Sequence, residues 1–252
     1  METTITLNID SSFRQNYYTT NSSDFTVNLN YPLNNVTSMK LKNIQLPNTW
    51  HDITGVNKNN YLFINSLKIV IPDGNYSNIK LATMFQLQCA IASLSVTLAV
   101  SVSSGFTTIT STMGNITLDF TEGSDVFKNS LGWLLGFRQQ TLTGATEYTS
   151  TAMFNSSRFR YLYLLVDDLN YDKELIIANL ESSYFSGNII AILRVNEGSY
   201  GTVNIDNSEL QKRNYQLPVK IRKLKIKILD PLGKIINLNG CEFSFSLEFT
   251  LV

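Results

Sequence analysis

A single histidine, His51, limits the chemistry that this chain of 252 residues can perform. One histidine excludes a His-rich metal site within one chain, and any Ser-His-Asp arrangement would have to be built on His51. Asp52 follows it directly, but adjacent residues of an extended segment point to opposite faces, so the two are poorly placed as a dyad. The sequence contains no G-x-S-x-G elbow. We therefore expect no catalytic residue and predict that the chain is not an enzyme.

Two groups of acidic residues are the candidates for binding a cation. They are Asp119, Glu122 and Asp125 in one group, and Asp167, Asp168, Asp172 and Glu174 in the other. Either group could hold calcium between strands, but neither has the ligand spacing of a known calcium-binding loop. Aspartate is also common in turns and at helix caps. We predict no metal and no other cofactor.

The highest density of charge lies in residues 219–229. Five cations, Lys220, Arg222, Lys223, Lys225 and Lys227, are interleaved with Val219, Ile221, Leu224, Ile226 and Ile228. A β-bulge at Arg222 and Lys223 would put every cation on one face of a strand and every apolar group on the other. We predict an interface there, for an acidic neighbouring subunit or for DNA phosphates. The alternative is an exposed strand whose lysines prevent unwanted edge pairing.

The overall composition is low in charge. Charged residues make up 16% of the chain, and 20 cationic residues balance 20 acidic ones, against a usual share of about 25%. Asn, Ser and Thr must therefore cover the surface, which tolerates close association with copies of the same chain. Cys89 and Cys241 lie far apart without a CxxC neighbour. They are interpreted as buried small hydrophobic residues, with a disulfide as the alternative.

Short alternating runs separated by turn residues indicate strands. Phe25, Val27 and Leu29 alternate with polar residues, and residues 242–251 form the cleanest run of this kind. In residues 39–46 the apolar parity changes, which predicts a bulge near Lys42 and Asn43. One amphipathic helix is predicted over 78–94, with Ser77 as its N-cap.

These elements predict an all-β chain. Roughly eight to ten strands, one helix and no βαβ alternation favour an antiparallel jelly-roll sandwich, a single roll with long loops. We expect one domain over residues 1–252, with an N-terminal arm over 1–18 and a loop insertion over 139–157. No apolar run reaches the ~18 residues needed for a membrane span, and the N-terminus lacks the features of a secretory signal.

Residues 9–53 carry a series of motifs. They are Ile9-Asp10-Ser11-Ser12-Phe13-Arg14, then Asp24-Phe25 opening the first alternating run, then Pro32-Leu33-Asn34-Asn35-Val36, and finally Ile44-Gln45-Leu46-Pro47-Asn48. This block resembles the opening of capsid-associated jelly-roll proteins (penton or minor capsid proteins) of large nucleocytoplasmic double-stranded DNA viruses. Residues 73–76 and the helix after them, and residues 131–137, extend the resemblance more weakly.

The resemblance implies a structural protein of the virion, made in the host cytoplasm or a virus factory. The size of a single roll favours the vertex (penton) protein, assembling as a pentamer through a heterologous interface that closes into a ring. Its expected partners are further copies of itself, the major capsid protein and other minor capsid proteins, with weak contact to packaged DNA. The first alternative is a minor or cement capsid protein between or beneath the major capsomers.

A rival from another class is a carbohydrate-binding β-sandwich module for host attachment. It requires several exposed aromatic side chains on one face, and the loop candidates are Tyr17, Tyr18, Trp50, Tyr148 and Tyr184. A hydrolase would require His51 or the Asp167 and Asp168 pair to be essential for activity.

Overall fold

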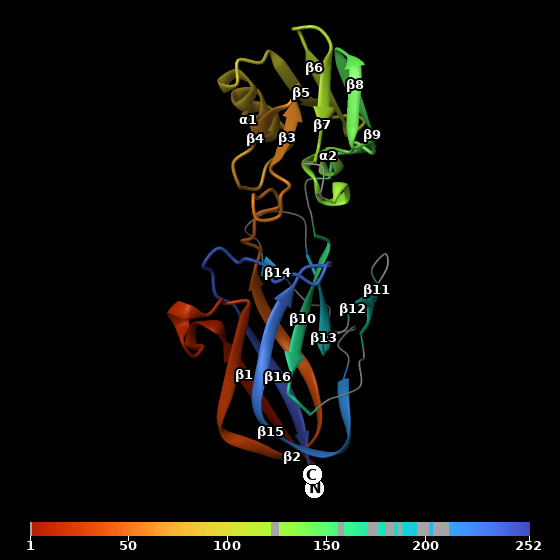
Figure 1. Ribbon diagram of the computed structural model, residues 1–252. Helices are drawn as coiled ribbons and strands as arrows, with labels where there is room; N and C mark the ends of the chain where they lie inside the picture. The colour runs from red at the N-terminus through yellow and green to blue at the C-terminus, as the bar shows by residue number, and fades with distance from the viewer. Residues whose placement is uncertain are drawn as a thin grey trace. The chain divides into compact units, whose positions relative to one another are not determined.

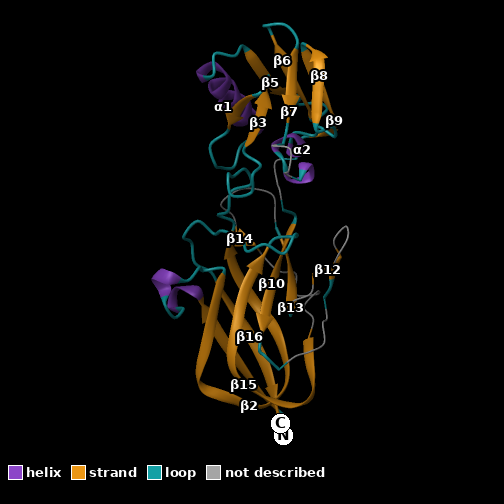
Figure 2. Ribbon diagram, viewed as in Figure 1, coloured by secondary structure: helices purple, strands orange, loops and turns teal. Residues whose placement is uncertain are grey.

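The computed structural model describes residues 2–121, 126–155, 159–170, 176–179, 184–185, 188–195, 202–203 and 212–252 (Figure 1). The chain divides into two compact units. Unit 1 consists of Met1–Trp50 and Phe159–Val252, and unit 2 consists of His51–Arg158. Unit 2 is therefore inserted into the sequence of unit 1. Strands dominate both units (Figure 2).

Unit 1 is an antiparallel β-structure. Its strands are β1 (Thr3–Asp10), β2 (Asp24–Pro47), β10 (Tyr161–Asp167), β11 (Ala178–Asn179), β12 (Tyr184–Phe185), β13 (Ile189–Arg194), β14 (Thr202–Val203), β15 (Lys212–Leu229) and β16 (Ser244–Leu251). The main sheet has the order β1-β16-β2-β15-β10-β13, with β14 paired to β2 and β11 paired to β12 separately. Two short 3-10 turns, Ser11–Phe13 and Tyr17–Thr19, join β1 to β2.

The two longest strands, β2 and β15, make this sheet fold over on itself. One half of β2 pairs with β16 and with the start of β15, and the other half pairs with the end of β15. Register shifts separate the halves, and Asn35 in the bend has a left-handed φ of 57°. Figure 1 shows both strands curving at one end of the unit. The two layers then enclose a single apolar core, which confirms the predicted jelly-roll sandwich.

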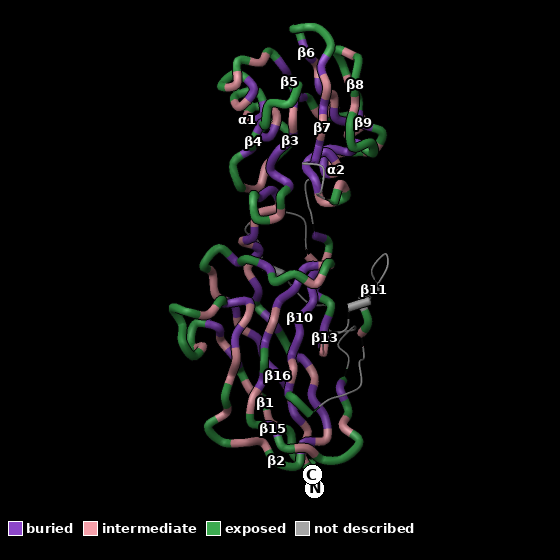
Figure 3. Tube along the Cα trace, viewed as in Figure 1, coloured by how far each residue is buried: buried purple, intermediate pink, exposed green. Residues whose placement is uncertain are grey.

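The core of unit 1 follows the alternation of the sequence. Buried members from the two layers include Met39, Leu41, Phe245, Leu247 and Phe249 from one, and Phe25, Leu162, Leu164, Leu224 and Ile226 from the other. In Figure 3 buried and less buried positions succeed one another along these strands. The predicted bulge is confirmed, because Leu41 pairs with Leu247 while Asn43 pairs with Ser246, which leaves Lys42 as the extra residue.

Unit 2 contains two smaller sheets. Its strands are β3 (Tyr61–Ile64), β4 (Leu67–Val70), β5 (Val96–Val100), β6 (Phe106–Ser111), β7 (Ile116–Asp119), β8 (Thr141–Ala145) and β9 (Glu147–Met153). The sheets have the orders β4-β3-β7-β8 and β5-β6-β9. Helix α1 (Asn78–Ile91), the one-turn helix α2 (Leu131–Leu134) and the 3-10 turn Phe127–Asn129 complete the unit. Both sheets and both helices contribute to one buried cluster.

Helix α1 forms much as its sequence predicts. The Ser77 side chain accepts a hydrogen bond from the Lys80 N–H (3.4 Å) and caps the helix. Leu81, Phe85 and Cys89, spaced by four residues, are its buried positions. The helix ends at Ile91, three residues before the predicted end at residue 94, and Ile91 is exposed.

The domain organisation differs from the expected one. Residues 139–157, expected as a loop insertion, contain β8 and β9, which pair with β7 and β6. Most residues of β8 and β9 are exposed or half-buried, so these strands need few apolar residues. Their Thr-rich sequence therefore lacks the apolar alternation by which a strand is recognised. The actual insertion, unit 2, is longer than the one predicted. The expected N-terminal arm over 1–18 contains β1, which pairs with β16 along its whole length.

Gly136 provides a test of the packing in unit 2. Its φ is +93°, and an added Cβ would lie 2.0 Å from the Ala152 carbonyl oxygen. Gly114 has a φ of +95° with nothing within 4 Å of an added Cβ. Both alanine variants incur roughly 1–2 kcal/mol of left-handed strain. We expect Gly136→Ala to cost about 1–3 kcal/mol more than Gly114→Ala in urea unfolding, because only Gly136 would overlap the backbone. Equal losses would contradict this packing.

Candidate interaction surfaces

The residues considered for catalysis and metal binding do not form a site in the part of the chain that the structure describes. His51 is half-buried where unit 2 begins. Asp119 accepts a hydrogen bond from the Thr121 N–H (3.0 Å), as aspartate does in turns. Over the described ranges, no group of three or more His, Cys, Asp or Glu residues is arranged to hold a metal ion. Glu122, Asp125, Asp172 and Glu174 lie outside the described residues.

Asp168 instead belongs to a buried ion pair inside unit 1. Its carboxylate lies 2.9 Å from the Arg213 guanidinium, and the two side chains are 0% and 1% exposed. The Tyr215 hydroxyl donates a hydrogen bond to the same carboxylate oxygen (2.5 Å), while Arg213 also donates to the carbonyls of Val166 (2.8 Å) and Asn188 (3.1 Å). Burial, and then the nearby Asp168 carboxylate, raise the pKa of Tyr215. The pair therefore fastens the start of β15 to β10.

Sequence reasoning did not anticipate this pair. Arg213 lies 45 residues from Asp168 in the sequence, and it follows Lys212, so it resembles an ordinary surface cation. Only the folding of the sheet places its guanidinium inside. No local pattern in the sequence signals that position.

Removing one partner of the buried pair is expected to destabilise unit 1 strongly. Asp168→Asn leaves the Arg213 charge without a counter-ion and should cost about 3–5 kcal/mol in chemical unfolding. The control is Lys225→Gln, which removes one partner of the Lys225 and Asp167 pair, 3.9 Å apart with Lys225 47% exposed. This control should cost less than about 1 kcal/mol. Similar losses for the two variants would show that burial of the Asp168 pair is unimportant.

The Ile9–Arg14 motif also has a structural role. Asp10 caps the following 3-10 turn by accepting from the Ser12 N–H (2.8 Å). Arg14 lies 2.7 Å from the Glu242 carboxylate, and the Ser11 hydroxyl donates a hydrogen bond to the same oxygen. We call Ser11, Arg14 and Glu242 the N-terminal clamp. It holds the end of β1 to the residues that lead into β16.

Further contacts fix the arginine of the N-terminal clamp. Arg14 donates to the carbonyls of Ser11 (2.7 Å) and Tyr17 (3.2 Å), and its guanidinium lies 4.1 Å from the centre of the Tyr17 ring. Partial burial acts to raise the pKa of Glu242, but hydrogen bonds from Arg14, Ser11 and Tyr17 outweigh it and lower the pKa. The carboxylate form of Glu242 is therefore favoured in the folded chain.

The N-terminal clamp predicts that the native chain is more stable than Glu242→Gln by an amount that depends on pH. A lowered folded-state pKa contributes stability that is present above the ordinary glutamate value of 4.5 and is lost as the pH falls below it. At pH 7 Glu242→Gln should lower the free energy of unfolding by about 1 kcal/mol. Thermal unfolding from pH 7 to pH 3 should show the two melting curves converge in acid. A difference that stays constant would exclude a role for the charge of Glu242.

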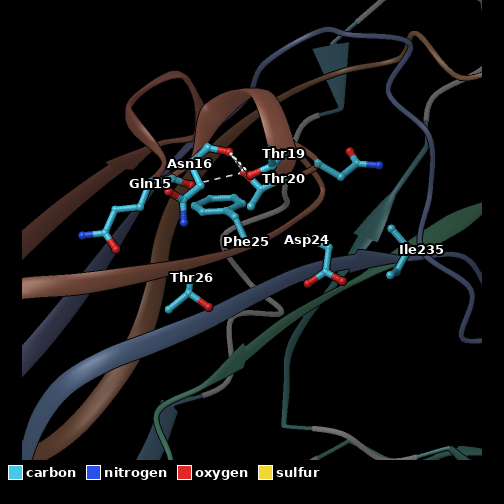
Figure 4. Close-up of a pocket in the computed structure, with 9 residues that line it drawn as sticks. Gln15, Asn16, Thr19, Thr20, Asp24, Phe25, Thr26 and Ile235 are labelled. Atoms are coloured by element: carbon cyan, nitrogen blue, oxygen red, sulfur yellow. Dashed lines mark hydrogen bonds between the residues drawn. The ribbon is translucent and has the colours of Figure 1, made fainter.

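Two cavities adjoin the N-terminal clamp. One, of about 430 Å³, is lined mainly by amide and hydroxyl side chains, with Asp24 as the carboxylate of its lining (Figure 4). The other, of about 490 Å³, lies between residues of β1 and β2 and includes Phe13 and Arg14. Gln15, Phe25 and Thr26 line both.

The aromatic residues considered for sugar binding do not gather on one face. Trp50 is 3% exposed in the core of unit 1. Tyr148 belongs to unit 2, where its hydroxyl donates to the Ile116 carbonyl (2.9 Å). Tyr17 and Tyr18 are exposed next to one another, with ring centres 5.2 Å apart. The side chain of Tyr184 lies outside the described residues.

The two cysteines are free thiols. Cys89 is buried in the core of unit 2, and burial raises its pKa to about 11. Cys241 is partly buried against the core of unit 1. Both therefore pack as small hydrophobic residues.

The five cations of β15 lie on one face, as their spacing predicts. Ile221, Leu224, Ile226 and Ile228 are fully buried, whereas Lys220, Arg222, Lys223, Lys225 and Lys227 are exposed or half-buried. The register shift between Ile221 and Lys223 has its extra residues on β2, between Leu33 and Asn28, so it belongs to the bend and is not the bulge predicted in β15. We call these five residues the cationic face. Whether it is an interface stays a prediction.

Helix α1 presents a second uncommitted surface, which the sequence analysis did not identify. Ile79, Leu87 and Ile91, spaced by multiples of four residues, are 80%, 51% and 70% exposed. We call these three residues the α1 stripe. Lys80 is the single charged residue of the helix. Since a helix with apolar residues on opposite faces is normally covered on both, the α1 stripe is suited to a protein contact.

Comparisons with known proteins support the fold. No family model matches the sequence, and no curated protein matches it. Among solved structures, the mavirus penton protein matches with a TM-score of 0.53 and 11% sequence identity, over 100% of both chains. A chain in the structure of the Sputnik virophage matches with a TM-score of 0.50 and 12% identity, over 98% of each chain. The chain therefore has the fold of these proteins along its full length. No helix in the described part of the chain is long and apolar enough to span a membrane.

Proposed function

We propose that this chain is a vertex (penton) protein of the capsid of a double-stranded DNA virus, and that it assembles into a pentamer. The observation that carries the proposal is the fold, which matches the mavirus penton protein over the whole of both chains, including the inserted unit. The Ile9–Arg14 motif agrees with it, because Ser11 and Arg14 have a structural role in the N-terminal clamp. The protein then acts within the virion, together with other capsid proteins, by surface complementarity.

The low charge of the chain agrees with self-association. Little long-range repulsion opposes the approach of identical subunits when positive and negative residues are equal in number. In a ring of five, each subunit uses two different patches, one for each neighbour. The α1 stripe provides an apolar candidate for one of them, and we propose a second copy of the chain as its occupant.

Light scattering of the purified full chain tests the pentamer. A discrete species of five times 28.4 kDa, stable over a range of protein and salt concentrations, is the expected result. A monomer at every concentration would contradict the proposal and favour the minor capsid protein. A monomer that also binds glycans on an array would favour the carbohydrate-binding module.

The α1 stripe predicts a specific effect on assembly. Leu87→Glu combined with Ile91→Glu should raise the concentration for half-assembly by at least about tenfold, because burying a carboxylate in an apolar contact is costly. The melting temperature of the monomer should change little, since both side chains are exposed. Lys80→Glu, another exposed change on the same helix, is the control and should assemble normally. Unchanged assembly of the double variant would place the subunit contact elsewhere.

A further inference from the structure

Part of the cationic face lies on an internal stretch of β15: Lys225 and Lys227 have partner strands on both sides, whereas among the described residues only β2 pairs with β15 around Lys220, Arg222 and Lys223. In the sheet order, β15 stands between β2 and β10. Lys225 and Lys227 are paired across both neighbours, with Thr26 and Asp24 on β2 and with Asp167 and Leu165 on β10. Lysines that protect an edge from unwanted pairing have no such function on a strand whose hydrogen bonds are already made on both sides. Edge protection therefore does not explain Lys225 and Lys227, and for Lys220, Arg222 and Lys223 it is the alternative that the experiment below tests.

The charge of the cationic face is only partly compensated. Lys225 and Lys227 each lie 3.9 Å from a carboxylate, that of Asp167 and that of Asp24. For Lys220, Arg222 and Lys223 there is no ion pair with any residue that the structure describes. The whole of β15, Lys212–Leu229, contains no acidic residue. Like charges gathered on one face repel one another, so their presence requires a reason other than stability.

The chemistry around the cationic face favours a phosphate backbone over a folded protein. The residues of β2 opposite Lys223 and Lys225 are Asn28 and Thr26, and Leu165 on β10 is buried. A protein interface has an apolar or aromatic centre with few charges. The cationic face itself consists of charges, and the apolar groups beside it are Tyr163, Leu165 and Leu229, which are buried, and Tyr31, which is exposed in the bend of β2. Lys, Arg, Asn and Thr are the side chains that contact phosphate oxygens in protein complexes with DNA.

The geometry is consistent with a contact to the phosphate backbone of DNA that does not depend on the base sequence. Side chains on one face of a strand recur about every 6.7 Å, so Lys223, Lys225 and Lys227 form a row, and Lys220 and Arg222 continue the positive charge into the bend of β15. None of the five positions is aromatic, so the row offers no platform on which unpaired bases could stack. We propose that the cationic face binds the phosphate backbone of double-stranded DNA without sequence preference. This inference is independent of pentamer formation.

Fluorescence anisotropy with a labelled 30-base-pair duplex and the full chain tests the proposal. Binding should be detectable at 50 mM salt and should weaken steeply toward 200 mM. The triple variant Lys220→Gln, Arg222→Gln and Lys223→Gln should reduce the slope of log affinity against log salt by about one for each residue, and should weaken binding at least tenfold at 50 mM. A second duplex of unrelated sequence should bind equally.

The matched control removes three exposed cations elsewhere, as Lys80→Gln, Arg160→Gln and Lys234→Gln. It lowers the net charge by the same amount and should retain most of the binding and most of the slope. No binding at 50 mM, or equal losses in the two triple variants, would overturn the proposal. Competition by polyglutamate as strong as that by duplex DNA, at equal charge, would assign the cationic face to an acidic protein and would also overturn it.

Discussion

The pairing of β2 with β15 is the contact on which unit 1 depends. These two strands are the longest of the unit and remain hydrogen-bonded to each other through the bend that separates the two layers. Every other strand of the main sheet is attached to this pair, β16 and β1 on one side and β10 and β13 on the other. The apolar core forms only because the bend brings the buried faces of both halves together. The bent β2 and β15 pair therefore provides both the hydrogen bonds between strands and the burial of the core residues.

Polar contacts then secure the sheet at two places. The N-terminal clamp fastens β1 to the approach to β16, and the Asp168 and Arg213 pair fastens β15 to β10. They differ in environment, because Arg213 and Asp168 are fully buried whereas Glu242 retains some exposure. A buried pair adds little net stability but strongly penalises any arrangement that separates its partners. It therefore acts mainly to specify which strands are neighbours.

The two uncommitted surfaces suit different partners. The α1 stripe, on unit 2, is apolar and nearly free of charge, while the cationic face, on unit 1, consists of charged side chains. The first is suited to another protein surface of low charge and the second to a polyanion. The two proposals therefore assign self-association to the α1 stripe and DNA binding to the cationic face, and each can be tested by variants of one surface alone.

The sequence by itself determined the features that depend on local periodicity. Alternation placed the strands around Phe25 and over 242–251, a parity change located the bulge at Lys42, and Ser77 marked the start of α1. These succeed because side-chain direction in a strand or helix follows from spacing along the chain. Tertiary structure alone decided which segments share a core. It formed unit 2 from residues 51–158 and turned the expected loop over 139–157 into two strands. It also placed Arg213 inside and Ile79 outside, and gave Lys225 and Lys227 partner strands on both sides. Each of these outcomes depends on contacts between residues far apart in the sequence, which local spacing does not encode.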